Sequence, residues 1–88
     1  MISEKDRKKI ESIADKYKVS AIILFGSAAE EDQPADIDLA VKGIDKRFFF
    51  KFYAELFKNL SKPVDLIDLS VKSLFTDMIE KNGIKIYG

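Results

Sequence analysis

Two aspartates interrupt an apolar segment in the first half of this 88-residue chain. The segment ADIDLAVK runs from Ala35 to Lys42, and its last seven residues, starting at Asp36, have the length and composition of a strand. Side chains in a strand alternate between two faces, so Asp36 and Asp38 share one face with Ala40 and Lys42. Ile37, Leu39 and Val41 then form the core-facing side. The aspartates are therefore predicted to line a second, open face of a sheet.

A third carboxylate follows in the segment KPVDLIDLS, where Val64–Leu69 reads as another strand. If its Val64 and Leu66 face the core, Asp65 points to the same open face, whereas Asp68 is expected to cap the strand end or to be solvated. Carboxylates brought together repel each other and resist ionisation unless a cation is present. Magnesium prefers such oxygen ligands. Three carboxylates can hold two magnesium ions, which clamp the attacking and leaving oxygens of a phosphoryl or nucleotidyl transfer.

A Gly-Ser pair precedes these aspartates and suits a phosphate group. The apolar run SAIILF ends at Gly26 and Ser27. Glycine lets the backbone approach a phosphate closely, and a helical turn after it would direct N–H groups at the anion. The Ser27 hydroxyl adds a donor or acceptor. Lys42, on the carboxylate face, is a candidate counter-charge. Taken alone, the Gly-Ser pair is better explained as a plain turn and Lys42 as a solvated lysine. The two aspartates alone fit a charged edge strand equally well.

The elements that must position these residues alternate along the chain. Ser3 is predicted to cap a helix beginning at Glu4, and another helix is expected from Asp45 or Lys46 to Leu60. A third helix, capped by Ser70, is predicted to turn Val71, Leu74, Phe75, Met78 and Ile79 inward. The predicted strands are Val19–Phe25, Asp36–Lys42, Val64–Leu69 and Ile84–Tyr87, with a polar loop over 28–35 that contains one helical turn. This order predicts one domain over residues 1–88, of α/β (α+β) class, with about four strands.

Composition excludes several functional classes. There is neither cysteine nor histidine, so disulfides, thiolate or histidine metal sites and histidine acid–base catalysis are ruled out. Fifteen basic and fifteen acidic residues cancel, which argues against general nucleic-acid binding. No apolar run has the length of a membrane span, and the first residues do not read as a signal peptide. A soluble, cytoplasmic protein is expected.

Together, "LFGS", "DIDLAV" and "VDLIDL" resemble the minimal nucleotidyltransferase (MNT) family of the DNA polymerase β superfamily. The resemblance implies a mixed sheet with helices packed on one face and a carboxylate site on the other. It further implies that Gly26 and Ser27 bind the phosphates of ATP and that Asp36, Asp38 and Asp65 bind Mg²⁺. Asp65 would also activate the attacking hydroxyl. Many MNT proteins are antitoxins that transfer AMP to a tyrosine of a HEPN-domain toxin, so a HEPN-type partner is implied here.

One departure from this family pattern keeps an alternative open. Family members often carry basic residues after Gly-Ser, whereas this chain has Ala28, Ala29, Glu30, Glu31 and Asp32. An acidic loop is unfavourable beside a triphosphate. The alternative is therefore a degenerate MNT-fold module that neutralises its partner by contact alone. Because the chain is short, the acceptor protein or a second copy of the chain is expected to complete the site.

The segment RFFFKFYAELF carries more aromatic residues than one helix face requires. Five of its apolar residues and the Leu60 that follows keep helical spacing, but Phe48 and Phe50 fall at or beyond the margin of that stripe. They fit either a partner-binding surface or a broad buried face around a thin sheet. The residues of the predicted stripe are Phe49, Phe52, Tyr53, Leu56, Phe57 and Leu60.

Overall fold

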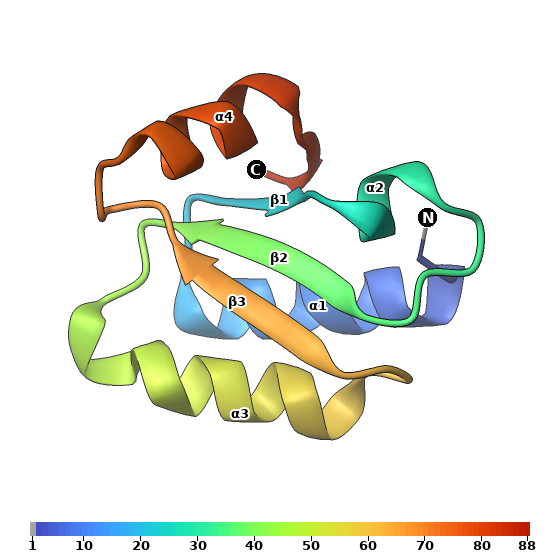
Figure 1. Cartoon of the computed structure of the whole chain (residues 1–88). Helices are drawn as coiled ribbons and strands as arrows, with labels where there is room; N and C mark the ends of the chain where they lie inside the picture. The colour runs from blue at the N-terminus through green and yellow to red at the C-terminus, as the bar shows by residue number, and fades with distance from the viewer. Residues whose placement is uncertain (1) are drawn as a thin grey trace.

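The computed structural model describes residues 2–88, which form a four-stranded mixed sheet with helices on both faces (Figure 1). The strand order is β3-β2-β1-β4; β1 runs antiparallel to β2 and β4, and β2 runs parallel to β3. This architecture confirms the predicted fold class. The elements are α1 (Glu4–Tyr17), β1 (Ala21–Leu24), α2 (Ser27–Glu30), β2 (Ile37–Lys42), a 3-10 turn η1 (Lys46–Phe48), α3 (Phe49–Asn59), β3 (Val64–Asp68), α4 (Leu74–Asn82) and β4 (Ile84–Tyr87).

Helix α1 begins where the sequence predicts. The Ser3 side chain accepts a hydrogen bond from the Asp6 backbone N–H at 3.1 Å, which satisfies one of the N–H groups left unpaired at a helix start. The buried Asp6 carboxylate accepts in turn from the backbone N–H and the hydroxyl of Ser61, and so ties α1 to the turn before β3. At 14 residues α1 is the longest helix described, and none formed by residues 2–88 combines the length and apolar character needed to cross a bilayer.

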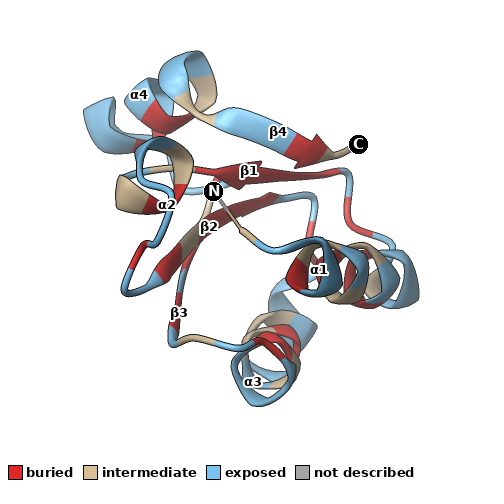
Figure 2. Ribbon diagram, turned by 90° about the vertical axis from the view of Figure 1, so that its right-hand side faces the viewer, coloured by how far each residue is buried: buried red, intermediate tan, exposed pale blue. Residues whose placement is uncertain are grey.

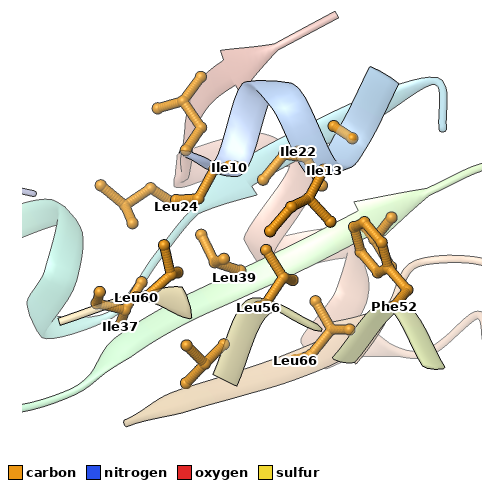
Figure 3. Close-up of a cluster of buried hydrophobic side chains, with 14 of the residues drawn as sticks. Ile10, Ile13, Ile22, Leu24, Ile37, Leu39, Phe52, Leu56, Leu60 and Leu66 are labelled. Carbon is orange, nitrogen blue, oxygen red and sulfur yellow. The ribbon is translucent and has the colours of Figure 1, made fainter. Parts of the chain in front are cut away.

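The main core lies between the sheet and the helices α1 and α3, which cover the same face (Figure 2). Side chains from α1, α3 and the three strands β1, β2 and β3 meet there, as Figure 3 shows. The contribution of β2 is the predicted alternate set Ile37, Leu39 and Val41, all essentially inaccessible to solvent. Because the core takes these three residues, Asp38 between them must point to the other face.

The face that α3 buries is narrower than predicted. Phe52, Leu56 and Leu60 are buried, but Phe57 is 56 % exposed and Phe50 is 81 % exposed. A helix lying over the edge of a thin sheet buries only one stripe, and Phe57 falls outside it. The expectation that Phe57 belongs to the core is therefore wrong, and Phe50 lies outside the core as well.

The last helix differs most from its prediction. Ser70 does not cap it; α4 begins at Leu74, and Ser73 forms a capping box with Thr76. This later start turns Thr76 and Ile79 onto the sheet and leaves the expected inward residues Val71, Leu74, Phe75 and Met78 exposed. Ile79 packs with Ile23, Ala40 and Leu69 on the face opposite to α1 and α3. Helices therefore lie on both faces, and α4 shares its face with the carboxylates.

Two phenylalanines two residues apart on α3 test the assignment of the core. Phe52→Ala should lower the free energy of unfolding by about 3–5 kcal/mol, because it removes a fully buried ring and leaves a cavity. Phe50→Ala, at an exposed site on the same helix, should change it by less than about 1 kcal/mol. Urea unfolding followed by circular dichroism measures both, and equal losses would contradict the assigned orientation of α3.

Candidate functional site

The turn after β1 brings Gly26 against Asp38. The Phe25 N–H donates to the Asp38 carbonyl oxygen at 3.0 Å, so pairing with β2 continues one residue beyond β1. Gly26 then adopts φ 61° and ψ −147°, a combination that L-residues with a side chain rarely adopt. A Cβ at this position would lie 2.7 Å from Asp38 Oδ2. Both the backbone angles and the contact with Asp38 therefore require glycine here.

Ser27 opens α2, a four-residue helix for which Gly26 is the N-cap. This is the single helical turn predicted within the loop. The Ala29 N–H donates to the Gly26 carbonyl at 3.1 Å and the Glu31 N–H donates to the Ser27 carbonyl at 2.8 Å, which fixes the turn. The half-buried Ser27 thus lies directly after the glycine that contacts Asp38.

The parallel pairing of β2 and β3 places two of the three predicted carboxylates side by side. Asp38 and Asp65 are register partners, and their neighbours Leu39 and Leu66 are both buried in the main core. Alternation therefore sends both carboxylates to the opposite face, on strands spaced about 4.8 Å apart. Asp36 lies just before β2 rather than in it, and is exposed.

The electrostatics of Asp38 reflect this crowding. Partial burial raises the pKa of the Asp38 carboxyl, and the negative charges of Asp65 and then of Asp36 raise it further. Each cause disfavours the charged form of Asp38. A cation bound between these groups would relieve all three effects.

The donor set fits a hard divalent cation such as Mg²⁺, because carboxylate oxygens are its preferred protein ligands. Within residues 2–88, however, no three acidic side chains already converge closely enough to hold a metal ion. The structure brings Asp38 and Asp65 together as neighbours and leaves Asp36 at their flank.

Lys42, the predicted phosphate-binding cation, is not brought to this site. It ends β2, whereas Asp38 lies near the beginning of that strand. Its ammonium pairs instead with the Glu80 carboxylate of α4 at 3.2 Å. Asp68 behaves as predicted for a strand-end cap, because its side chain accepts from the Ser70 N–H at 2.9 Å.

A hollow of about 300 Å³ opens beside Gly26, between α2 and α4. Phe25 and Phe75 form part of its wall and meet edge to face, with ring centroids 5.9 Å apart. Glu30 also lines the hollow, whereas Asp32 lies in a separate cavity with Lys62. Sequence reasoning missed this hollow because it placed Phe75 in the core. The Ser73-Leu-Phe-Thr76 capping pattern was the signal that would have moved the helix start.

A family model described as "Polymerase beta, Nucleotidyltransferase" matches residues 8–88. The chain belongs to this nucleotidyltransferase family. The Asp-x-Asp formed by Asp36 and Asp38, the Gly-Ser turn and β3 with Asp65 all lie inside the matched range.

Named relatives of this nucleotidyltransferase come from an archaeon. Two proteins of Methanocaldococcus jannaschii carry the name "putative protein adenylyltransferase". One is 37 % identical over 88 residues, covering 96 % of this chain and 88 % of its own length. The other is 36 % identical over 81 residues, covering 90 % of this chain and 74 % of its own length.

Two solved structures that contain a chain similar to this nucleotidyltransferase are described as toxin–antitoxin complexes. A chain from the crystal structure of a toxin–antitoxin with AMP-PNP aligns with a TM-score of 0.77 at 28 % identity, covering 93 % of this chain and 73 % of that one. A chain from the tri-AMPylated Shewanella oneidensis HEPN toxin in complex with MNT antitoxin aligns with a TM-score of 0.72 at 27 % identity, covering 94 % and 70 %.

The raised pKa of Asp38 should make the stability of the fold depend on pH. A carboxyl whose pKa is raised by folding contributes most to stability when protonated, and this contribution is lost as pH rises through its folded pKa. Asp38→Asn, which stays neutral, should therefore raise the melting temperature at pH 7. The gain should shrink as pH falls and should vanish below the ordinary aspartate pKa. Thermal unfolding between pH 3 and pH 8, roughly the range that spans aspartate titration, measures this. The exposed Asp77→Asn is the control, and an equal gain from it would contradict the assigned cause.

Proposed function

We propose that this nucleotidyltransferase is magnesium-dependent and transfers AMP from ATP to a hydroxyl, a tyrosine of a HEPN-type partner protein. The observation that carries the proposal is the pairing of Asp38 with Asp65 on the face where Gly26 contacts Asp38. The names of the M. jannaschii relatives and the AMPylated HEPN toxin of the Shewanella complex support AMP as the transferred group. In this role the chain would be the antitoxin of a toxin–antitoxin pair.

Each residue would have a defined task. Gly26 and Ser27 would bind the phosphates through the backbone and the hydroxyl. Asp36, Asp38 and Asp65 would hold Mg²⁺, which supplies positive charge to the triphosphate when bound. The tyrosine oxygen would attack the α-phosphorus of ATP, its proton would pass to the Asp65 carboxylate, and pyrophosphate would leave.

The position of Asp65 suits this task. It is exposed on β3, which forms one edge of the sheet, so an acceptor side chain can approach from solvent without crossing another strand. Asp38 lies one strand further in and is half-buried. The more accessible carboxylate is thus the one proposed to meet the acceptor hydroxyl.

A second candidate function is supported by Glu30. Its side chain lines the hollow beside Gly26, where its charge would oppose a triphosphate. If ATP does not bind, the chain would act as a degenerate MNT-fold module that neutralises its partner by contact alone. The two functions differ in whether covalent AMP appears on the partner.

The transfer proposal predicts a specific labelling result. The chain is mixed with the HEPN-type partner, Mg²⁺ and ATP labelled at the α-phosphate, and label on the partner is measured. Asp38→Asn and Asp65→Asn should each lower the labelling rate by at least about 100-fold, as expected for loss of a group that stabilises the reacting charges. Lys42→Ala should leave the rate within about 2-fold, because Lys42 pairs with Glu80 away from the site. A tight complex without label would favour the contact-only function.

The acidic turn gives a separate prediction about ATP binding. Glu30→Gln should tighten binding of Mg²⁺–ATP by about 2- to 5-fold, because it removes one negative charge near the proposed phosphate site. Asp32→Asn, on the other side of the loop, should have a smaller effect. The ATP-dependent rise in melting temperature reports both affinities through linkage. Equal effects of the two substitutions would contradict the assigned position of Glu30.

A further inference from the structure

The outer face of α3 carries a second apolar stripe, opposite the one that enters the core. Phe50, Ala54 and Phe57 follow the spacing i, i+4, i+7 and therefore lie on one side of the helix. Phe50 is 81 % exposed and Phe57 is 56 % exposed, so nothing within residues 2–88 covers the stripe. These two rings flank the small Ala54, and the three line a shallow, open depression of about 700 Å³ on the outer surface of α3, which we call the α3 groove.

The base of the α3 groove is braced by the core. Phe50 meets Phe49 edge to face at 5.3 Å, and Phe49 meets Tyr53 in the same way at 6.2 Å. The Tyr53 hydroxyl donates to the Val64 carbonyl oxygen of β3 at 2.8 Å. The Phe50 end of the α3 groove is therefore linked to the sheet through a chain of aromatic contacts.

The edges of the α3 groove are basic. Lys51 and Lys58 both line it, and neither forms an ion pair in the part of the chain that the structure describes. The one acidic residue that lines it, Glu55, already binds Lys16 at 3.0 Å and the Tyr17 hydroxyl. Lys51 interacts with the charge of Glu55 over a longer distance. The local surface thus combines exposed aromatic rings with two lysines whose ammonium groups are available to a partner.

We propose that the α3 groove binds an amphipathic helix of a partner protein. Apolar side chains of that helix, spaced by three or four residues, would enter between Phe50 and Phe57, and flanking Asp or Glu residues would pair with Lys51 and Lys58. An exposed apolar stripe along two turns of a helix is a surface on which another helix can pack. The charge of its edges selects an acidic partner.

Charge also argues against a second copy of this chain as the occupant. In a two-fold pairing of α3 about Ala54, Lys51 of one copy would approach Lys58 of the other, and like charges would meet without compensation. The other exposed apolar patch, on α4, has no comparable charge bias. Its Glu80 binds both Lys42 and Lys72, at 3.2 and 3.7 Å. The α3 groove is therefore the better candidate for a charged partner helix.

The position of the groove is compatible with catalysis. Helix α3 covers the face of the sheet opposite to Asp38 and Asp65, so a partner held there leaves the carboxylates open. The inference rests on the proposed function only for the choice of the partner used in the test.

The test measures the affinity of the full chain for the HEPN-type partner by isothermal titration calorimetry. The double variant Phe50→Gln/Phe57→Gln removes the two exposed rings of the α3 groove. The double variant Lys51→Glu/Lys58→Glu reverses the charge of the two lysines beside it. Each pair should weaken binding at least about 30-fold, as expected for aromatic and charged groups at the centre of an interface. Leu74→Gln/Met78→Gln, a matched pair of exposed apolar residues on α4, should change it by less than about 3-fold. Circular dichroism checks that every variant is folded.

Several outcomes would overturn the proposal. These are no binding by the unsubstituted chain, unchanged binding by both α3 pairs, or loss of binding in the α4 control alone. Conversion of a dimer to a monomer by Phe50→Gln/Phe57→Gln, seen by sedimentation, would assign the groove to a second copy. Binding to phosphatidylserine vesicles in place of the partner would assign it to a membrane. If the complex depends on the α3 groove but the partner receives no label, AMP transfer is refuted and the binding inference stands. If label is transferred and neither α3 pair affects the transfer, the binding inference is refuted and AMP transfer stands.

Discussion

The alternation of side chains along β2 is the constraint on which the rest of this molecule depends. Ile37, Leu39 and Val41 are taken by the core under α1 and α3, and a shift of one residue would place Asp38 in that core. An unpaired buried carboxylate costs several kcal/mol, so the core fixes the register firmly. The register in turn pairs Asp38 with Asp65 on the parallel neighbour. The hydrophobic packing of one face thereby determines the charge arrangement of the other.

Much of this could be predicted from periodicity alone. The capped start of α1, the strands around Asp38 and Asp65, and the opposite placement of Leu39 and Leu66 follow from local patterns that tertiary packing reinforces. The pairing of Asp38 with Asp65 could not be derived in this way, because it depends on the order of the strands. The position of Lys42 at the far end of β2 was implicit in the numbering, but its pairing with Glu80 depended on where α4 lies.

The errors concern helices that lie over the margins of a thin sheet. A stripe of apolar residues predicts the buried face of a helix when the surface beneath is broad. On the second face of the sheet, Thr76 and Ile79 are the residues of α4 that become buried, whereas the apolar residues Leu74 and Met78 of the same helix stay exposed. The same limit leaves Phe57 of α3 exposed. In a chain of this size there are more apolar side chains than core to receive them, because small domains bury a modest fraction of their surface.

The place of β3 at the edge of the sheet has a consequence for solubility. An edge strand presents backbone N–H and C=O groups that can pair with a strand from another molecule, and charged side chains along such an edge prevent this. Asp65, exposed in the middle of β3, is such a charge. The carboxylate proposed to accept the tyrosine proton is therefore also placed where it would oppose edge-to-edge pairing with another molecule. Evolutionary loss of catalysis by mutation of Asp65 would carry a penalty in solubility, so an inactive descendant of this fold has a physical reason to retain the aspartate.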